Sequence, residues 1–569
     1  MSKEDSNELM SICKRRGFIW PSFELYGGVA GMYDYGPLGC TMKNNILGVW
    51  RDIYKGREGF VEIDSETVNP EEVFKASGHV DEFSDYMTNC TQCQSPFRAD
   101  HLVKDLCENP DVMSPKELED AFVEFNIKCP ECEGELGKVE DFNLMFKTTI
   151  GPGSSRVGYL RPETAQGIFV NFENLYRYNR EKLPLGVIQT GRGYRNEISP
   201  RQGMIRMREF NMMEVELFVD PNNKDWSRFS EIENEELILL PNTGCDTIVK
   251  TVKQAVEEGI IANRVLAYFV CTTKQLLIRM GIEPSKLRFR QHLMDEMAHY
   301  AADCWDAEVL LSYGWTEITG IADRGCWDLS RHSQFSGSDL SHFEMFDEPQ
   351  EVTSMKVLAN HKKLGPVFKG KAKDIVAALD SKTEKDVKDG KITLIVDNET
   401  IELTNEFFEI KQVTEKVTGR HVVPHVIEPS HGLDRIFYSL LEHSYFYDKK
   451  REYSVLRLKP EVAPIKVGIF PLMNKDNLDV LAKEIYGKVH SPNAEAYYDS
   501  SGTIGKRYAR MDEIGTPWCI TVDYESIEGP EKDTVTIRER DTGDQKRIPI
   551  DKVSEIIQRL IKGKEFSEL

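Results

Sequence analysis

The chain of 569 residues is too long for a single hydrophobic core, and its length predicts two to four domains. Its hydrophobic content of 40% and charged content of 29% are those of an ordinary globular protein, and no run of 18 apolar residues predicts a membrane span. The net charge of −22 argues against binding nucleic acid through overall charge, so such a partner must meet a local basic patch. The charged amino terminus lacks a hydrophobic signal region, which favours a cytoplasmic protein without disulfides.

The first strong pattern along the chain lies in residues 20–60. Glycines cluster around Tyr33 and Tyr35, and Pro37 then opens a helical pattern. The apolar positions of this pattern recur at helical spacing, at Met42, Ile46, Val49, Trp50 and Ile53. We therefore expect a helix that packs on a core.

Two C-x-x-C knuckles follow, separated by 35 residues, and they contain Cys90, Cys93, Cys129 and Cys132. Thiolates at this spacing can close a tetrahedral zinc site. The site would be structural, because four sulfurs leave no open position for catalysis. The spacer is long, so a helix such as "SPKELEDAFVEF" must fit within an insertion of about residues 88–140.

Residues 195–218, "RNEISPRQGMIRMREFNMMEVELF", concentrate charges of both signs among apolar residues. A strand would place Met207, Glu209, Asn211, Met213, Val215 and Leu217 on one, mostly apolar face. The other face would carry Arg206, Arg208, Phe210, Met212, Glu214, Glu216 and Phe218. Pro200 and Gly203 predict a hairpin loop. We expect an antiparallel hairpin whose underside packs on helices; the charged face either binds a ligand or is a solvated row of ion pairs.

The rest of the chain predicts two further insertions and a second domain. Residues 220–285 are polar and helical, and residues 345–420 are rich in Lys, Asp and Glu; both are expected to be insertions. Composition then changes at Pro460 and Pro464. Strands and helices alternate from there to the end, with "DTVTIRERD" as an edge strand, which predicts a separate α/β domain.

The block "GTIGKRYAR" in this last domain is a basic patch that contains a tyrosine. Its charges are Lys506, Arg507 and Arg510. Such a patch can clamp phosphates and stack on exposed bases of single-stranded RNA. It can also be a helix start with ordinary solvated charges, and the pattern alone leaves both interpretations open.

Five blocks resemble those of glycyl-tRNA synthetases of the homodimeric type, which are class II aminoacyl-tRNA synthetases. They are "YGGVAGMYDYGPLG", "RPETAQGIF", "RNEISPRQGMIRMREF", "EPSHGLDR" and "GTIGKRYARMDEIGTP", in the family's order between about residues 17 and 530. The resemblance implies an α+β fold with an antiparallel-sheet catalytic domain flanked by helices at 1–458, including the three insertions. It also implies an α/β anticodon-binding domain at 459–569, and a homodimer formed through the Pro37 helix, which resembles the family's motif 1.

By this resemblance, the charged face of residues 195–218 is the floor of a site for ATP with Mg²⁺. Arg195 would meet the α-phosphate, Phe210 would stack on adenine, and Glu197 would contact the adenine side. Arg206 and Arg435 would hold the far phosphates of a bent ATP, so Arg195 and Arg435 are the expected catalytic residues. Asn196, Met207, Glu317 and Ile318 would complete the site. Adenylation needs the amino-acid carboxylate placed in line with the α-phosphate, and cations that bind the crowded polyphosphate. It does not need a protein nucleophile.

The resemblance also implies a glycine site, in which Glu163, Glu214 and Glu428 with Pro429 and Ser430 would surround the ammonium group. Arg161 and Gln166 would brace this pocket, and crowding would exclude a methyl group. Each glutamate alone could equally form a strand-face ion pair with a neighbouring arginine. Arg98 would approach the substrate or the tRNA end.

The expected reaction joins glycine to tRNA(Gly) through glycyl-adenylate, with release of diphosphate and AMP. A non-catalytic nucleic-acid-binding protein on the same scaffold and a synthetase for another small amino acid are the alternatives. A non-catalytic protein would have lost ATP-site residues, and these are all present. Asp434 stands where the family's motif 3 usually has glycine, and we expect only altered local packing there.

Overall fold

The computed structural model describes residues 3–569 except 105, 108, 154, 201, 245, 294–300, 381, 383–385, 389, 397–398 and 493. The chain forms two compact units. The larger combines Met1–Leu340 with Val423–Leu569, and the smaller is Ser341–Val422. No helix in the described part of the chain is both long and apolar enough to cross a membrane.

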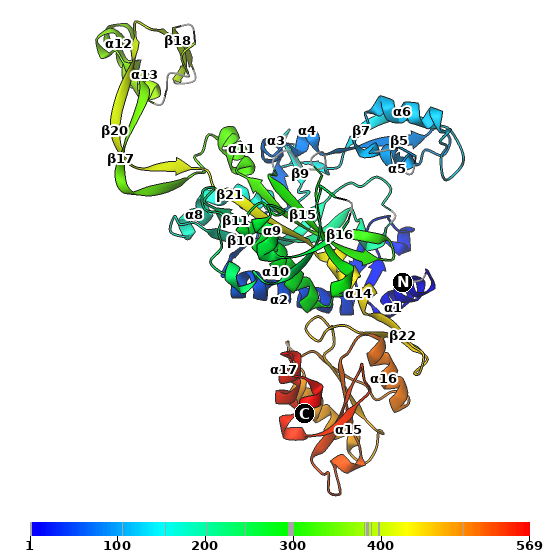
Figure 1. The fold of residues 1–569 in the computed structure, drawn as a ribbon. Coiled ribbons are helices and arrows are strands. Elements are labelled where there is room, and N and C mark those ends of the chain that lie inside the picture. The colour runs from blue at the N-terminus through cyan, green and yellow to red at the C-terminus, as the bar shows by residue number, and fades with distance from the viewer. Residues whose placement is uncertain are drawn as a thin grey trace. The chain divides into compact units, whose positions relative to one another are not determined.

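A nine-stranded sheet forms the centre of the larger unit (Figure 1). Its strand order is β13 (Ile248–Thr251), β12 (Glu236–Leu240), β14 (Leu287–Gln291), β15 (Asp303–Leu311), β16 (Gly314–Gly325), β21 (His425–Gly432), β11 (Glu209–Val219), β10 (Leu185–Tyr194) and β3 (Val61–Ile63). Neighbouring strands are antiparallel except for the pairs β12–β14 and β10–β3 near the two edges. The predicted antiparallel sheet is therefore confirmed.

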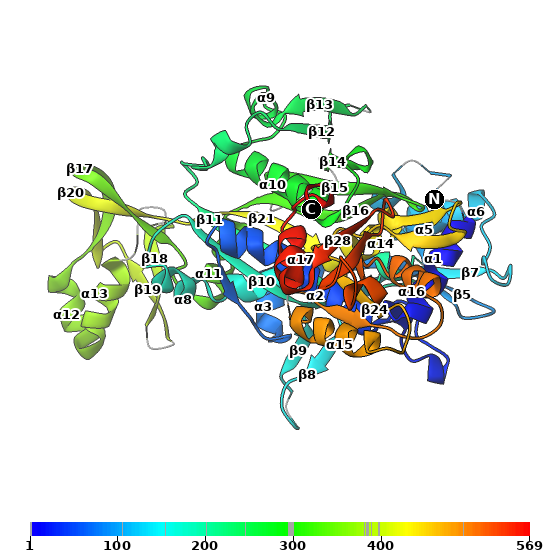
Figure 2. The same ribbon diagram turned by 90° about the horizontal axis from the view of Figure 1, so that it is seen from below.

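Three helices cover one face of this sheet: α2 (Pro37–Arg51), α10 (Arg264–Met280) and α14 (Leu433–Ser444) (Figures 1 and 2). Their apolar side chains share a core with Met213, Val215 and Leu217 of β11. This confirms the predicted helix at Pro37 and the predicted apolar underside of β11. Residues 220–285 were expected as an insertion, but they supply β12 and β13 to the sheet and α10 to its main core.

The hairpin around residues 195–218 differs from the prediction in its bounds. The paired strands are β10 and β11, and residues 195–208 form the connecting loop, with one 3-10 turn at Gly203–Ile205. Of the two interpretations of the charged face, the solvated row is wrong for Glu214 and Glu216, because they are 1% and 0% exposed. Helices α7 (Ala165–Phe169) and α11 (Trp327–Ser336) contribute Phe169 and Leu329 to a second core with Phe218, which explains this burial. We call this side of the sheet, opposite α2 and α10, the pocket face.

The cysteine knuckles lie on a small sheet of order β6 (Pro96–Arg98), β5 (Ser84–Cys90) and β7 (Leu136–Asn143). The expected helix within the spacer is α6 (Pro115–Glu124). A capping box starts it, in which the side chains of Ser114 and Glu117 each bond the other residue's backbone N–H. The smaller unit, Ser341–Val422, has two long paired strands, β17 (His342–Ala359) and β20 (Phe408–Val422). Helices α12 (His361–Phe368) and α13 (Ala372–Asp380) and the hairpin β18 (Lys391–Val396) and β19 (Glu399–Thr404) lie between them in the chain.

The carboxyl-terminal domain has a five-stranded sheet of order β25 (Ala496–Tyr498), β24 (Val467–Pro471), β26 (Trp518–Val522), β27 (Thr534–Glu539) and β28 (Gln545–Pro549). Its helices are α15 (Leu478–Val489), α16 (Ile504–Glu513) and α17 (Val553–Ile561). The predicted α/β alternation is confirmed. The prediction of β27 as an edge strand is wrong, because β28 pairs with it and takes the edge.

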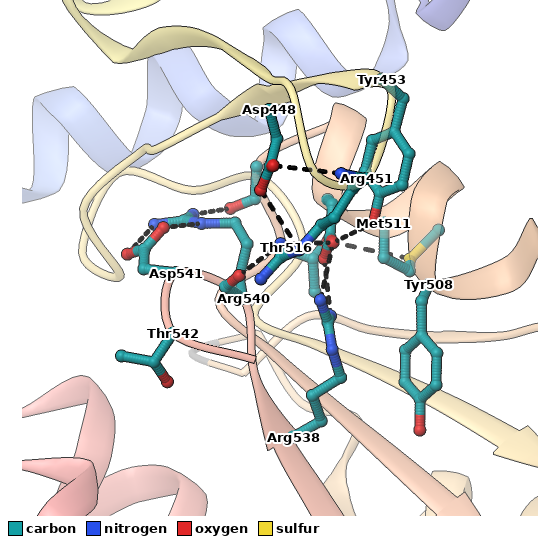
Figure 3. A network of polar contacts seen from close by, with 12 residues as sticks. Asp448, Arg451, Tyr453, Tyr508, Met511, Thr516, Arg538, Arg540, Asp541 and Thr542 are labelled. Carbon is teal, nitrogen blue, oxygen red and sulfur yellow. Dashed lines mark hydrogen bonds and ion pairs between the residues drawn. The ribbon is translucent and has the colours of Figure 1, made fainter. Parts of the chain in front are cut away.

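A buried carboxylate joins this domain to the hairpin β22 (Tyr445–Asp448) and β23 (Tyr453–Leu456), which directly follows α14. Asp512 of α16 is fully buried and accepts two hydrogen bonds from Arg538, at 2.9 Å each. Tyr453 donates a third at 2.8 Å and Arg451 a fourth at 3.2 Å, and Figure 3 shows these donors converging. The linker is fixed by Lys466, whose ammonium donates to the carbonyls of residues 460, 461 and 463.

Candidate active site

A cleft opens on the pocket face. It brings together Arg195, Glu197, Arg206, Met207, Phe210, Glu317, Ile318 and Arg435. These are eight of the nine residues expected at the ATP site. The ninth, Asn196, is not among the residues that line the cleft; its backbone N–H donates to the carbonyl of Leu144 at 2.6 Å.

Arg195 lies between two aromatic rings. Its guanidinium carbon is 5.3 Å from the ring centre of Phe210 and 5.3 Å from that of Phe83. Nε donates to the carbonyl of Pro162 at 3.3 Å. Cation–π contacts on both sides orient the planar group, so its remaining N–H donors are available to an anion in the cleft.

Arg206 and Arg435 are each held by a carboxylate. Arg206 Nε lies 2.8 Å from Glu197, and Arg435 Nη1 lies 3.0 Å from Glu317 Oε2. Arg435 is the main cause that lowers the pKa of Glu317. Arg435 also donates to the carbonyl oxygens of Ile205 and Glu317, which ties α14 to the loop and to β16.

Asp434, the departure from the family's usual glycine, does more than alter local packing. Its carboxylate accepts from the backbone N–H of Asn211 at 2.5 Å, from the Asn211 side chain at 3.0 Å, and from the Tyr35 hydroxyl. The residue is 2% exposed. It therefore fastens the start of α14, and with it Arg435, to β11 and to the segment before α2.

Strand register places two of the expected glycine-site residues, Glu214 and Ser430, in one row across the pocket face. Glu214 on β11 pairs with Ser430 on β21, which pairs with Gly320 on β16. Ser430 donates to Glu214 Oε1 at 3.0 Å, and Oε2 accepts from the N–H (2.7 Å) and the hydroxyl of Thr164. Ser430 lines the cleft, whereas Glu163, Glu214 and Glu428 are not among its lining residues.

Pro429 does not share this row. It lies between Glu428 and Ser430, so strand alternation turns its side chain toward the helices. Its expected role in glycine binding is therefore restricted to its backbone.

Glu163 is held by its neighbours. Gln166 donates to Oε1 at 2.8 Å, and His79 Nε2 lies 3.7 Å from Oε2. Burial is the largest single influence and opposes ionisation, but His79, Arg324 and Gln166 together outweigh it, and the pKa of Glu163 is lowered. For Glu214 burial dominates and its pKa is raised. The pKa values of the two carboxyl groups are therefore shifted in opposite directions.

A second group of charges lies behind the glutamates. Arg324 binds Asp328 through two nitrogens, at 2.8 and 3.0 Å, and its third nitrogen donates to Glu428 at 2.5 Å. Burial raises the pKa of Glu428 to about 8 despite this ion pair. Gln166 connects this group to Glu163, because it also donates to Asp328 at 3.0 Å and accepts from His332 at 2.8 Å.

Arg161 braces the backbone and does not reach into the cleft. It is 4% exposed, and it donates to the carbonyl oxygens of Arg192 at 2.9 Å and of Ser65 at 2.8 Å. A Cβ on Gly191 would lie 2.1 Å from its Nη2. Only glycine therefore leaves room for this guanidinium beneath β10.

Arg98 is engaged inside the knuckle insertion. It binds Asp85 at 3.0 Å and Asp100 at 2.6 Å, so its direct contact with a substrate would require these ion pairs to break. The insertion does reach the connecting loop of residues 195–208, because the Ser199 hydroxyl donates to the carbonyl of Pro96.

The four knuckle cysteines come together. The Sγ atoms of Cys90 and Cys132 are 3.4 Å apart, those of Cys93 and Cys129 are 3.6 Å apart, and all four lie within 4.8 Å of one another. Tetrahedral zinc with Zn–S bonds of about 2.3 Å requires sulfurs about 3.8 Å apart, so the four thiols fit the ion. A Cβ on Gly134 would lie 2.9 Å from two side-chain atoms of Gln92 and 3.2 Å from Cys132 Sγ, which explains the glycine beside the second knuckle.

The basic patch on α16 is mostly occupied by the protein itself. Arg507 is 3% exposed and donates to the carbonyl oxygens of residues 471, 500, 501 and 502, so it is a structural residue and not an RNA clamp. Arg510 binds Asp499 at 2.5 Å and the carbonyl of Ser501 at 2.6 Å. Lys506 is exposed.

Sequence reasoning missed the residues that fix the glutamates: His79, Thr164, Arg324, Asp328 and His332. Arg324 and Asp328 are four residues apart, a helical ion-pair spacing that could have indicated a partnership. The sequence gives no sign that this pair faces Glu428, because that contact joins β16 to β21.

Comparison with known proteins identifies both parts of the chain. The model of the tRNA synthetase class II core domain (G, H, P, S and T) matches residues 153–444, and that of the anticodon binding domain matches residues 466–560. The glycine–tRNA ligase of Methanothrix thermoacetophila is 50% identical, over 98% of this chain and 97% of its own. The glycine–tRNA ligase of Methanocaldococcus jannaschii is 47% identical, over 99% of this chain and 100% of its own. That of Methanothermobacter thermautotrophicus is also 47% identical, over 97% of this chain and 98% of its own. With half of its residues identical over almost its whole length, the chain belongs to the glycine–tRNA ligase family of class II tRNA synthetases.

Proposed function

We propose that this protein ligates glycine to tRNA(Gly) with ATP, through glycyl-adenylate, in the cytoplasm. One observation carries the proposal: the arginine-lined cleft meets the row that contains Ser430 and Glu214 on a single face of the sheet. A phosphate chain in the cleft and an amino acid on that row would be neighbours, as adenylation requires. The relatives named glycine–tRNA ligase support the same conclusion.

In this proposal the cleft residues bind ATP with Mg²⁺. Arg195 binds the α-phosphate, Arg206 and Arg435 bind the far phosphates, and Phe210 stacks on adenine. Glu317 holds Arg435 and faces the metal-bearing phosphates. When bound, Mg²⁺ neutralises the polyphosphate charge. Losing one such preorganised cation commonly costs about 100-fold or more in rate.

The glycine ammonium would bind among Glu163, Glu214 and Ser430, with Glu428 behind them. His79 and Gln166 keep Glu163 ionised and oriented. Thr164 and Ser430 fix Glu214 in one position. Side chains held this firmly cannot yield to a methyl group, so the pocket would select glycine by exclusion.

The carboxyl-terminal domain would bind the anticodon of the tRNA. Lys506, and Arg510 once released from Asp499, are the residues on α16 that can meet phosphates. We further propose that Cys90, Cys93, Cys129 and Cys132 hold one structural Zn²⁺. That ion would fix the insertion and would take no part in the chemistry.

We also propose that the protein is a homodimer through the segment around α2. The turn that precedes α2 exposes large apolar side chains: Phe23 is 54%, Leu25 88% and Tyr26 85% exposed. Such a cluster is unusual on a free surface and typical of an interface. A charge at Leu25, in Leu25→Glu, should shift the protein to monomer in light scattering.

Glycine-dependent exchange of diphosphate into ATP tests the function. Exchange with glycine, and not with alanine, serine or proline, is expected. No exchange with any amino acid would leave the non-catalytic nucleic-acid-binding protein as the better candidate, and exchange with serine or proline would assign another amino acid.

A further inference from the structure

Three side chains with metal-binding atoms meet at the far side of the pocket face. They are His292, which follows β14, and Cys304 and Asp306 of β15. One ligand atom from each lies within 4.8 Å of those of the other two. None of the three belongs to the zinc knuckles or lines the nucleotide cleft.

Strand pairing brings the three together. Cys304 and Asp306 are two residues apart, so their side chains project from the same face of β15. The backbone N–H of His292 donates to the carbonyl of Cys304 at 3.0 Å, which places the imidazole across from the thiol. His292 Nε2 then lies 2.8 Å from Asp306 Oδ2. The geometry is therefore fixed by the backbone.

We propose that His292, Cys304 and Asp306 form a three-ligand site for a divalent transition metal ion of the Zn²⁺ class. One imidazole nitrogen, one thiolate and one carboxylate suit such an ion, whereas Mg²⁺ prefers oxygen ligands alone. A zinc site with three protein ligands keeps its fourth position open to water or to an anionic group, in contrast to the closed four-sulfur knuckle. This inference does not depend on the proposed function.

The open position would face the reaction site. Asp306 pairs with Gly320 on β16, Gly320 pairs with Ser430, and Ser430 pairs with Glu214. Paired residues of antiparallel strands project from one face, so the three-ligand site continues the row of the glycine site. Two strand spacings separate Asp306 from Ser430, which is about 10 Å. Gly320 between them has no side chain to close the path, and it lines the cleft.

A simpler interpretation is a partly buried His–Asp pair beside an unrelated cysteine. The two interpretations differ in the role of Cys304, because the ion pair does not need the thiol. The ion pair also needs no metal, whereas the proposed site binds one through the sulfur.

Titration of the full chain with Co²⁺ distinguishes them, because a thiolate ligand gives Co²⁺ a near-ultraviolet charge-transfer band. We expect about two equivalents in the wild-type protein, one at the knuckles and one at the three-ligand site. Cys304→Ser should bind one equivalent of Co²⁺ fewer than the wild type, and the charge-transfer band from the Cys304 thiolate should be absent. Cys326→Ser is the matched control, since Cys326 is partly buried and outside both metal clusters, and it should bind like the wild type.

Two further variants make the result independent of any one substitution. His292→Gln should lose the same Co²⁺ equivalent as Cys304→Ser. Its Co²⁺ affinity at this site should fall by more than the 10- to 100-fold that is typical when a residue supporting a metal ligand is lost. Cys93→Ser should lose only the knuckle equivalent. Equal Co²⁺ stoichiometry in the wild type, Cys304→Ser and His292→Gln would overturn the proposal.

Discussion

Glu216 lies two residues beyond Glu214 on β11 and projects from the same face of the sheet, yet the two carboxyl groups have opposite surroundings. Glu214 accepts hydrogen bonds from Thr164 and Ser430. Neither carboxyl oxygen of Glu216 has a hydrogen-bond partner among the described residues. Burial, and then the charge of Glu428, raise the pKa of Glu216 well above its usual value. Glu216 therefore holds its proton to a higher pH than an ordinary glutamate does.

Glu216→Gln should stabilise the protein above about pH 4.5 by an amount that grows with pH. The folded chain holds a proton that the unfolded chain releases above that pH, so the wild type loses about 1.4 kcal/mol per pH unit from this residue. Glutamine has the shape of the neutral acid and no proton to lose. Urea unfolding between pH 5 and 8 measures the difference, and glycine activation should persist. A stability difference that does not change with pH would contradict this assignment.

Arg324 is expected to control glycine binding from behind the pocket. In Arg324→Met, Glu428 and Asp328 lose their shared cation, and breaking a buried ion pair typically costs about 3–5 kcal/mol. The KM for glycine should rise at least about 10-fold, the equivalent of 1.4 kcal/mol, while the KM for ATP changes less. Arg324→Lys retains the charge without the two-nitrogen contact, so its KM for glycine should lie between those of the wild type and Arg324→Met. An equal rise in both KM values would place Arg324 outside the glycine site.

Zinc removal should affect the insertion rather than the chemistry. The knuckles of the purified protein should hold about one Zn²⁺, and Cys93→Ser should lose that equivalent. Three of the knuckle cysteines, Cys90, Cys129 and Cys132, pack in a small core with Phe97, separate from the main core of the sheet. We therefore expect residues 84–143 to become sensitive to protease while diphosphate exchange continues. Full exchange activity in a metal-free, protease-resistant protein would remove the zinc assignment.

Asp512 is expected to hold the two domains of the larger unit together. Asp512→Ala leaves the buried guanidinium of Arg538 unpaired and removes partners from Arg451 and Tyr453 (Figure 3). The expected cost is about 3–5 kcal/mol, seen as an earlier calorimetric transition of the carboxyl-terminal domain. Aminoacylation of tRNA should fall more than diphosphate exchange. The control is Asp541→Asn, because Asp541 is 45% exposed and its pair with Arg540 should contribute about 1 kcal/mol or less.

Local patterns identified most of the elements before the fold was known. The Pro37 helix, the apolar alternation of β11 and the α/β order after Pro464 were all predicted, because each depends on the period of a single segment. The two C-x-x-C motifs were recognised in the same way, because each depends only on the spacing of two cysteines within one segment. The prediction of residues 220–285 as an insertion did not anticipate that α10 belongs to the main core, because the strands that bury twelve of its 17 residues come from distant parts of the chain.

The sequence by itself determined which chemical groups are present and which face of each segment is apolar, since both follow from residue type and period. Only the tertiary structure decided which carboxyl groups have partners: Glu214 and Glu216 look alike in the sequence, but one meets Thr164 and Ser430 while the other meets neither. It likewise decided that Arg507 holds backbone carbonyl oxygens and that His292 meets Cys304 and Asp306. The reason is physical: the charge and reach of a buried side chain depend on neighbours that strand register brings from far along the chain.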